Sequence, residues 1–134
     1  MPQTKILVVD DEQDIVRALT MRLRAVGYEV ITASDGLSGT QKAFQESPDL
    51  VILDIGLPGG NGHTVAERLM ENNKTMSTPI IFLTARTSEE DRKKAETTHP
   101  AGYLTKPFKS QELLDTVSRA LMLGHVRQGL AHGY

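Results

Sequence analysis

The sequence contains no cysteine and no tryptophan among its 134 residues. Without cysteine the chain can form neither a disulfide nor a zinc–thiolate site, so its fold does not depend on the redox state of a compartment. The first residues also lack the basic segment and the long apolar run of a secretory signal, and no apolar run approaches the length of a membrane span. We therefore expect a cytoplasmic protein without a membrane contact.

The chain also lacks a strong charge of either sign. Its net charge is -2, with a net -5 in residues 1–67 (5 basic, 10 acidic) and a net +3 in residues 68–134 (10 basic, 7 acidic). This mild skew does not favour direct nucleic-acid binding. The length suits a single domain. We assign residues 1–123 to it and residues 124–134, which lose their periodicity and contain three glycines, to a C-terminal tail or the start of a linker.

Strand-like and helix-like segments alternate five times along the chain. The stretches between the apolar runs are long enough for crossover helices, which predicts an α/β fold with a doubly wound parallel sheet. The second strand is less apolar than most of the others, and the fifth is short and ends at Pro107, so both belong at the edges. This gives the flavodoxin-like strand order 2-1-3-4-5. The expected strands are 5–10, 28–33, 50–54, 79–84 and 102–107.

Four helices are expected. The first spans 13–26, the second follows Asp35 and ends at residue 46, the third spans 62–72, and the last begins near residue 110. Asp35 and Ser110 are the expected N-caps of the second and the last of these. Three of the helices carry an apolar stripe that we assign to the core. The stripes are Ile15, Val16, Leu19, Leu23 and Val26; Val65, Ala66, Leu69 and Met70; and Leu113, Leu114, Val117 and Leu121.

The segment 88–98 differs from these helices. Thr87 and Glu90 predict a capping box at its start, but Ala95 is its only apolar residue, so it can bury little and should be the least anchored helix. It ends at His99 and Pro100 without the glycine of a left-handed cap, which would leave its last carbonyls to water. All four histidines lack metal-ligand spacing, and we expect them at the surface. They are His63, His99, His125 and His132.

Three carboxylates follow two of the apolar runs. Asp10 and Asp11 come after the first run, and Asp54 comes after the third. A charge at the end of a buried strand lies at the rim of the sheet, and the order 2-1-3-4-5 places its ligand-binding switch point between strands one and three. Three clustered carboxylates repel one another unless a cation holds them, and their oxygens suit Mg²⁺. The sequence therefore predicts a magnesium site in this crevice.

Thr84 and Lys106 stand at the ends of the fourth and fifth strands. A hydroxyl and an ammonium that face a metal–carboxylate cluster can hold a transferring phosphoryl group, whose chemistry depends mainly on positioning and charge neutralisation. With Asp54 as the nucleophile, the product would be an aspartyl phosphate.

Four segments resemble, in order and spacing, the motifs of the receiver domain of two-component response regulators, of the chemotaxis-regulator kind. They are residues 8–12 (VVDDE), 53–59 (LDIGLPG), 82–86 (FLTAR) and 103–108 (YLTKPF). The resemblance covers residues 4–123. It implies a phosphoacceptor switch that catalyses its own phosphorylation and dephosphorylation but does not turn over an external substrate.

The resemblance also implies roles for individual residues. Asp54 would accept a phosphoryl group from the phosphohistidine of a sensor histidine kinase or a histidine phosphotransfer protein. Asp11 and Asp54 would ligate Mg²⁺ directly, Asp10 would act through a metal-bound water, and the backbone carbonyl of Gly56 would be a further ligand.

Three further residues have implied roles in the switch. Lys106, placed by a cis bond to Pro107, would pair with a phosphoryl oxygen, and the hydroxyl of Thr84 would bond another. Tyr103 would then move from an exposed to a buried position. A downstream output protein or domain would read the face made by the fourth helix, the fifth strand and the fifth helix.

Each residue alone has a simpler interpretation, because an Asp-Asp pair often caps a helix and a lone lysine is usually solvated. Two rival functions fit the residues less well. A phosphatase of the haloacid-dehalogenase kind needs a carboxylate two residues after its nucleophile, where this chain has Gly56. A receiver-like scaffold that is not phosphorylated would be expected to lack Asp54, Asp11 or Lys106.

The chain departs from the pattern of the receiver domain at three places. Gly60 and Asn61 replace the usual methionine and aspartate, and His99-Pro100 replaces the usual glycine-alanine pair. Polar residues, Lys93 and Glu96, stand at positions of the segment 88–98 that are commonly apolar. These departures concern the shape of the output face and not the expected chemistry.

Overall fold

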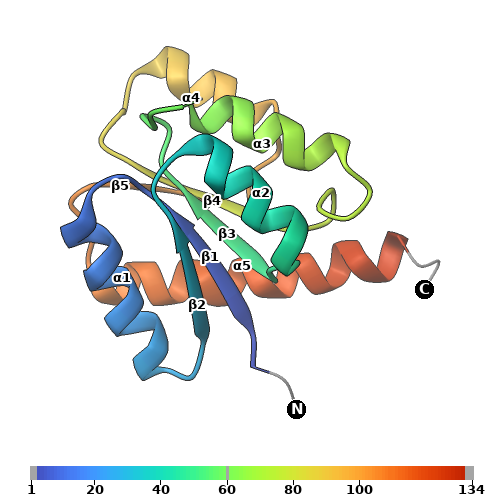
Figure 1. The fold of residues 1–134 in the computed structure, drawn as a ribbon, viewed down its shortest axis with the longest axis horizontal. Coiled ribbons are helices and arrows are strands. Elements are labelled where there is room, and N and C mark those ends of the chain that lie inside the picture. Colours follow the sequence, from blue (N-terminus) through green and yellow to red (C-terminus); the bar gives the residue numbers. More distant parts are fainter. Residues whose placement is uncertain (1–2, 60, 132–134) are drawn as a thin grey trace.

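The computed structural model describes residues 3–59 and 61–131 (Figure 1). A five-stranded sheet runs in the order β2-β1-β3-β4-β5, and all paired neighbours are parallel. This confirms the α/β fold, the strand order and the edge positions of the second and fifth strands. The strands are β1 (Lys5–Val9), β2 (Glu29–Ala33), β3 (Leu50–Leu53), β4 (Ile80–Thr84) and β5 (Gly102–Thr105).

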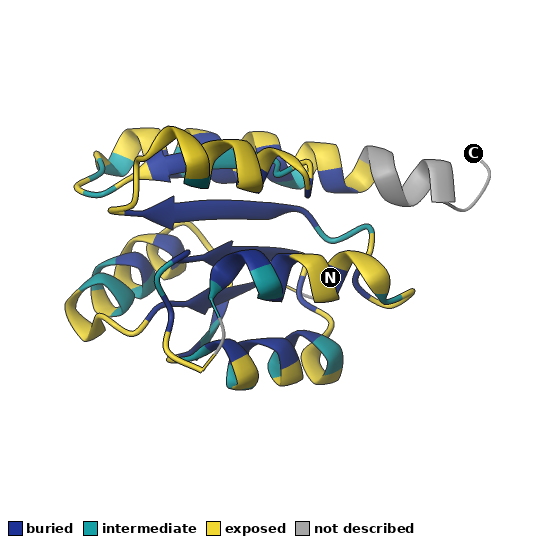
Figure 2. Cartoon of the chain, turned by 90° about the horizontal axis from the view of Figure 1, so that it is seen from above, coloured by how far each residue is buried: buried dark blue, intermediate teal, exposed yellow. Residues whose placement is uncertain are grey.

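Five helices connect or follow the strands and cover both faces of the sheet (Figures 1 and 2). Residues of α1 and α5 share one buried cluster with the sheet, and residues of α2, α3 and α4 share the other. The sheet is therefore the middle of three layers, as crossover helices on both faces require. The helices are α1 (Gln13–Ala25), α2 (Gly36–Glu46), α3 (Gly62–Glu71), α4 (Glu89–Glu96) and α5 (Ser110–Ala131).

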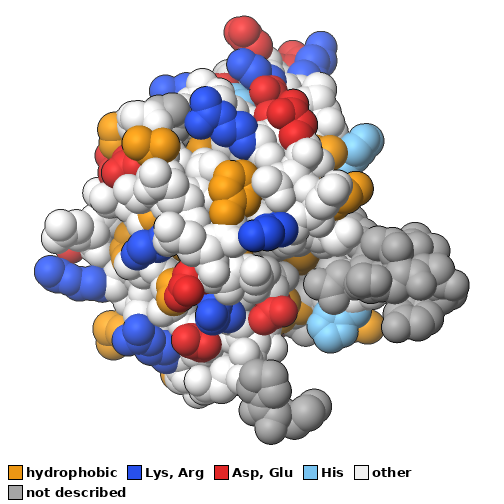
Figure 3. All heavy atoms as spheres, turned by 45° about the vertical axis from the view of Figure 1, so that its right-hand side comes forward, with side chains coloured by type: hydrophobic (Ala, Val, Ile, Leu, Met, Phe, Trp, Pro, Cys, Tyr) orange, Lys and Arg blue, Asp and Glu red, His pale blue; other side chains and the backbone are white. Residues whose placement is uncertain are grey.

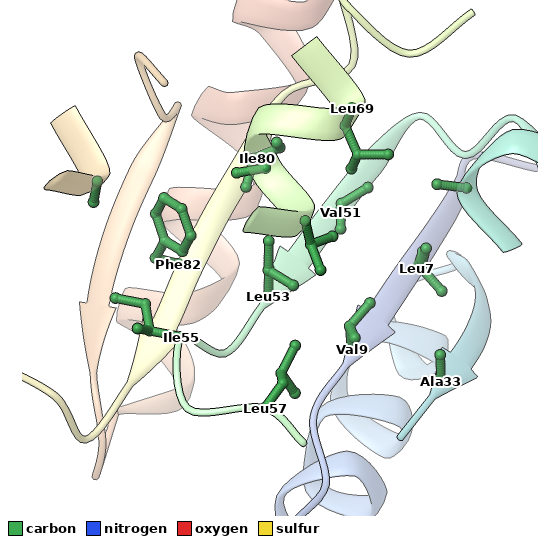
Figure 4. Close-up of a cluster of buried hydrophobic side chains, with 14 residues drawn as sticks. Leu7, Val9, Ala33, Val51, Leu53, Ile55, Leu57, Leu69, Ile80 and Phe82 are labelled. Carbon is green, nitrogen blue, oxygen red and sulfur yellow. The ribbon is translucent and has the colours of Figure 1, made fainter. Parts of the chain in front are cut away.

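The central strands are buried on both faces, because their successive side chains point alternately to the two helical layers. Leu7 and Val9 of β1 lie in the cluster beneath α2 and α3, together with the labelled side chains of β3 and β4 (Figure 4). Ile6 and Val8 lie in the cluster beneath α1 and α5. Neighbouring strands thus form a continuous core on each face of the sheet.

Two residues of the expected apolar stripes do not reach the core. Val26 is 54% exposed, because α1 already ends at Ala25 and Val26 is its C-cap. Met70 is 37% exposed near the end of α3, whereas Leu69 is buried. The remaining residues of the three stripes are buried or pack against the two clusters.

The helix ends follow the expected chemistry in part. The Asp35 carboxylate caps α2 by accepting from the backbone N–H of Ser38, as expected. Ser110 is the first residue of α5 rather than the residue before it. The cap of α4 is Ser88 and not Thr87: its hydroxyl oxygen accepts from the N–H of Asp91 and its O–H donates to the Asp91 carboxylate.

The end of α4 also differs from the expectation. His99 itself adopts the left-handed conformation (φ 50°), and its N–H donates to the carbonyl of Glu96 at 3.0 Å. The hydroxyls of Thr97 and Thr98 donate to the carbonyls of Lys94 and Ala95. The last carbonyls of α4 therefore accept hydrogen bonds within the chain. Two threonine side chains and a histidine in the left-handed conformation cap this helix in place of a glycine.

The segment expected to be a tail continues α5 as far as Ala131. The helix runs through Gly124. A Cβ at this position would lie 2.8 Å from Cδ of Pro79, so the glycine permits a close contact with Pro79. Residues 132–134, the end of the expected tail, lie outside the described residues. Among the helices of the described part, none is both long enough and apolar enough to cross a membrane.

Candidate functional site

The site begins where β1 and β3 end. Asp10 and Asp54 each follow the last residue of a strand, and their backbone N–H groups donate to the carbonyls of Ala33 (3.1 Å) and Val9 (3.0 Å). Both residues are buried, at 3% and 6% exposure. The sheet thus holds two neighbouring carboxylates at its carboxyl rim, where the sequence had predicted them.

Lys106 reaches the same place from the end of β5. Its peptide bond to Pro107 is cis, as expected, and its N–H donates to the carbonyl of Thr84 at 3.0 Å. Its ammonium Nζ lies 2.8 Å from Oδ2 of Asp10 and 3.2 Å from Oδ2 of Asp54. Side chains from three strand ends therefore meet at one ammonium group.

The electrostatics of this group follow from burial and mutual charge. Burial raises the pKa of Asp10, and the hydrogen bonds that it accepts from Lys106 and from the Glu12 N–H offset this only in part. Burial acts to lower the pKa of Lys106, but its hydrogen bonds to Asp10 and Glu12 and the charges of Asp10 and Asp54 outweigh that effect. The pKa of Lys106 is raised, so its ammonium stays charged.

The structure adds a carboxylate to the site that the sequence analysis did not assign. Oε1 of Glu12 lies 2.8 Å from Nζ of Lys106. One oxygen each of Asp10, Glu12 and Asp54 lie within 4.8 Å of one another, close enough to hold a metal ion. Glu12 directly follows the two aspartates, and this acidic run of three residues was the signal that could have identified it.

Asp11 takes a different position. It is exposed and lies outside this group of three carboxylates. Together with Asp10 it lines a hollow of about 440 Å³ that extends past Arg17 to Lys42 of α2. The structure therefore brings Asp10, Asp54 and Lys106 together and leaves Asp11 at the edge.

Gly56 and Arg86 lie against each other beside Asp54. The Gly56 N–H donates to Oδ1 of Asp54 at 3.2 Å. A Cβ at Gly56 would lie 3.3 Å from Nε of Arg86, so the arginine side chain occupies the space that a side chain at Gly56 would take. The space beside Gly56 is thus filled by the side chain of Arg86, which follows the end of β4.

Thr84 and Tyr103 are linked through Arg86. Thr84 is fully buried, and its hydroxyl oxygen accepts from the Arg86 N–H at 3.0 Å, which leaves its own hydrogen to donate. The Tyr103 hydroxyl donates to the carbonyl of Arg86 at 2.7 Å. Tyr103 is half-buried, which raises its pKa, and its ring lies under the guanidinium of Arg92 at 4.5 Å.

The expectation for the histidines was wrong at His63, which is only 3% exposed. Its Nε2 lies 3.2 Å from Oδ1 of Asp91, and its ring centroid is 5.9 Å from that of Phe82. His63 lies in the first turn of α3, where Phe82 of β4 and Asp91 of α4 cover its ring. His99 and His125 are exposed, and His132 lies outside the described residues.

The face shown in Figure 3 carries acidic and basic side chains intermingled, with separate small groups of hydrophobic ones. No extended area of one charge sign is visible on that face.

Comparison with known proteins agrees with this geometry. Residues 6–118 match the family described as the response regulator receiver domain. The chain is 41% identical over 118 residues to the transcriptional regulatory protein KdpE of Mycobacterium tuberculosis, which covers 88% of this chain and 51% of that protein. It is 43% identical over 109 residues to the alkaline phosphatase synthesis transcriptional regulatory protein PhoP of Bacillus subtilis, covering 81% and 45%. The chain thus spans about half the length of these two regulators.

Solved structures give the same result. The chemotaxis protein CheY4 of Vibrio cholerae superposes with a TM-score of 0.83 at 33% identity, covering 89% of this chain and 99% of that one. A CheY-like receiver domain protein of Methanospirillum hungatei superposes with a TM-score of 0.87 at 26% identity, covering 92% and 98%. With its motifs, its strand order and its rim of carboxylates and lysine in agreement, the chain belongs to the family of receiver domains of two-component response regulators.

Proposed function

We propose that the chain is a phosphoacceptor switch in which Asp54 receives a phosphoryl group from the phosphohistidine of a sensor histidine kinase or a histidine phosphotransfer protein. The observation that carries this proposal is the ammonium of Lys106, which lies 3.2 Å from Oδ2 of Asp54 and 2.8 Å from Oδ2 of Asp10. A cation fixed beside a carboxylate at the open rim of a sheet is suited to neutralise a phosphoryl group that arrives there.

The donor set fits Mg²⁺, which prefers carboxylate and carbonyl oxygens. Oxygens of Asp10 and Asp54 already lie within one small cluster that contains more negative than positive charge. Asp54, Asp10, the exposed carboxylate of Asp11 and the carbonyl of Gly56 would hold the ion. When bound, Mg²⁺ supplies positive charge that offsets the phosphoryl oxygens and the carboxylates.

The chain's own residues then perform the transfer. An oxygen of Asp54 attacks phosphorus, the new O–P bond forms, and the N–P bond of the phosphohistidine breaks. The electron pair of that bond returns to the imidazole, which takes up a proton. Lys106 neutralises an oxygen of the transferred group, and the hydroxyl of Thr84 donates its hydrogen to another.

The response would pass through the contact of Thr84 with Arg86. If the Thr84 side chain turns toward the phosphoryl group, its bond to the Arg86 N–H at 3.0 Å must change, and Tyr103 is bonded to the carbonyl of the same residue at 2.7 Å. Tyr103 would then move inward, and an output protein or domain would read the face formed by α4, β5 and α5. The domain acts as a switch in the cytoplasm, without direct nucleic-acid binding and without turnover of an external substrate.

Intact-protein mass spectrometry after incubation with acetyl phosphate tests this proposal. We expect one phosphoryl adduct that requires Mg²⁺ and is absent from Asp54→Asn. The matched control is Asp14→Asn, which removes an exposed aspartate at the start of α1 and should leave the adduct unchanged. An adduct that persists in Asp54→Asn, or that forms equally well with EDTA, would disprove the assignment.

A further inference from the structure

His63 makes a polar contact in an otherwise apolar part of the core. Its Nε2 lies 3.2 Å from Oδ1 of Asp91 in the first turn of α4. A carboxylate can only accept, so Nε2 must carry the proton and donate it. Within the described part of the chain, Nδ1 of the same ring is a buried atom without a hydrogen-bond partner, so Asp91 is the polar partner that fixes the ring.

The backbone that carries His63 is fixed to the segment of the phosphoacceptor. The N–H of the preceding residue, Gly62, donates to the carbonyl of Ile55 at 2.8 Å. A Cβ at Gly62 would lie 2.2 Å from the carbonyl oxygen of Asp54, so the two backbones are in direct contact. A displacement of the backbone next to Asp54 must therefore move the start of α3 and with it His63.

On its other side, His63 contacts a helix that has few other anchors. α4 has eight residues, and Ala95 is its only buried one. Its remaining described contacts include the guanidinium of Arg92 over the ring of Tyr103 at 4.5 Å. A short helix with so little buried surface is marginal by itself, so one part-buried hydrogen bond is a large part of what holds it.

The contacts of His63 and of the first turn of α4 form a ring of neighbouring side chains. The ring of His63 lies 5.9 Å from that of Phe82, which lies 6.2 Å from that of Tyr103. The guanidinium of Arg92 lies over the ring of Tyr103, and the carboxylate of the adjacent Asp91 contacts His63. The start of α4 is thus held between α3 on one side and β5 on the other.

We propose that His63 is a positioning residue that couples the backbone of Asp54 to the first turn of α4 through the His63–Asp91 hydrogen bond. This gives α4 a second connection to the phosphoacceptor, separate from the connection through Thr84 and Tyr103. The proposal deepens the proposed function and rests on it insofar as α4 responds to phosphorylation. The contact itself can be tested without any phosphorylation.

Two substitutions of His63 separate the hydrogen bond from the packing of the ring. His63→Leu keeps an apolar side chain but removes the donor, and Asp91 retains its bond from the Ser88 hydroxyl at 2.8 Å. His63→Gln places an amide N–H₂ near the position of Nε2 and restores a donor. A positioning role requires that His63→Leu loosens α4 and that His63→Gln does so less.

Amide hydrogen exchange of residues 89–96 is the measurement, with the amides of β1 as an internal reference for global unfolding. In the unmodified protein we expect about 2- to 12-fold faster exchange in His63→Leu, the range that corresponds to one hydrogen bond. In His63→Gln we expect a smaller change. His63→Leu should have a smaller effect in the Asp91→Asn background than in the wild type, because the hydrogen bond it removes depends on both side chains.

Glu89→Gln is the matched control, since it breaks an ion pair within α4 (3.7 Å to Lys93) in which both side chains are largely exposed. It should leave exchange nearly unchanged. Equal exchange in the wild type and His63→Leu, with unchanged exchange of β1, would overturn the proposal. So would equally fast exchange in His63→Leu and His63→Gln, which would indicate a packing role only.

Beryllofluoride with Mg²⁺ separates the failure of this proposal from failure of the proposed function. If α4 responds to beryllofluoride in the wild type and responds less in His63→Leu, both hold. If the wild type responds and the variant responds equally, the coupling through His63 is wrong while the proposed function stands. If the wild type binds no beryllofluoride, the proposed function is wrong, and the exchange of the unmodified variants still decides whether His63 positions α4.

Discussion

Gly62 lies directly against the backbone of Asp54. A Cβ at Gly62 would be 2.2 Å from the carbonyl oxygen of Asp54 and 2.8 Å from Cα of Ile55. Neither obstacle is a flexible side chain, so the start of α3 would have to move to accommodate any other residue. The glycine is needed for this close approach and not for a left-handed conformation, because Gly62 is not among the residues with a positive φ.

Gly62→Ala should therefore destabilise the fold even though alanine is the better helix former. We expect a loss of about 2 kcal/mol in the free energy of unfolding, within the usual range for overpacking, measured by urea denaturation. Gly39→Ala is the comparison. Its nearest obstacle is Cγ1 of Val9 at 2.8 Å, a side-chain atom that can shift, so its cost should be smaller. An equal or smaller loss in Gly62→Ala would contradict the rigidity inferred at Asp54.

Lys106 is the shared counter-charge of two carboxylates, those of Asp10 and Asp54. Its side chain is 8% exposed, and it neutralises two carboxylates that are themselves buried. Lys106→Met should lower the free energy of unfolding by roughly 3 kcal/mol, because the buried carboxylates lose their counter-charge. Mg²⁺ should restore part of this loss in the variant by binding the folded state.

Thermal or urea unfolding with and without Mg²⁺ measures both effects. Lys109→Met is the control, since Lys109 is exposed and close in sequence. It should change the stability little at either Mg²⁺ concentration. A stability of Lys106→Met that equals the wild type would show that the ion pairs around Lys106 contribute nothing to the fold.

Arg86 should lengthen the lifetime of the aspartyl phosphate by shielding it from water. Glycine at position 56 has no side chain that could cover the phosphoryl group on that side, so Arg86 is the side chain that can shield it. In the structure Nε of Arg86 lies 3.3 Å from where a Cβ of residue 56 would be. We therefore expect Arg86→Ala to speed hydrolysis several-fold by admitting water.

The loss of phosphoryl adduct over time, followed by mass spectrometry, gives the rate. Arg68→Ala removes an exposed arginine of α3 and should leave it unchanged. Gly56→Met should also alter the rate, because its side chain must displace Arg86. If neither Arg86→Ala nor Gly56→Met changes the rate, shielding at this position is unimportant.

Much of this could be predicted from local signals in the sequence. Strands buried on both faces produce continuous apolar runs, so β1, β3 and β4 and the polar residues at their ends were predictable, as were Asp10, Asp54, Thr84 and Lys106 at one rim. The positions of β2 and β5 at the edges followed from their weaker apolar character.

The errors arose where a tertiary contact decides the outcome. His63 is buried because α4 supplies Asp91, and no pattern within α3 signals this partner. The glycines after residue 123 suggested a tail or a linker, but α5 continues to Ala131 and Gly124 packs closely against Pro79. Glu12 enters the site because Lys106, 94 residues away, reaches it. Such long-range partners are not encoded in local periodicity.

The cap of α2 leads to a prediction about pH. The Asp35 carboxylate accepts from the Ser38 N–H at 2.7 Å and from the Ser38 hydroxyl at 3.0 Å, and these bonds hold the pKa of Asp35 below its ordinary value of 3.8. A carboxyl with a depressed pKa in the folded state stabilises the fold fully above its unfolded pKa. That contribution is lost as the pH falls through the lower, folded-state pKa.

Asp35→Asn separates the titration from the cap. Asparagine caps a helix about as well as aspartate but does not titrate in this range. We therefore expect the wild type to lose more stability than Asp35→Asn when the pH falls from 5 to about 3. The two stability curves should separate only at the acid end of this range. Asp35→Ala should be less stable than both at pH 7, because it leaves the first N–H groups of α2 without a cap. Urea denaturation at a series of pH values measures the three curves. Parallel curves for the wild type and Asp35→Asn would mean that the carboxylate at Asp35 contributes no pH-dependent stability.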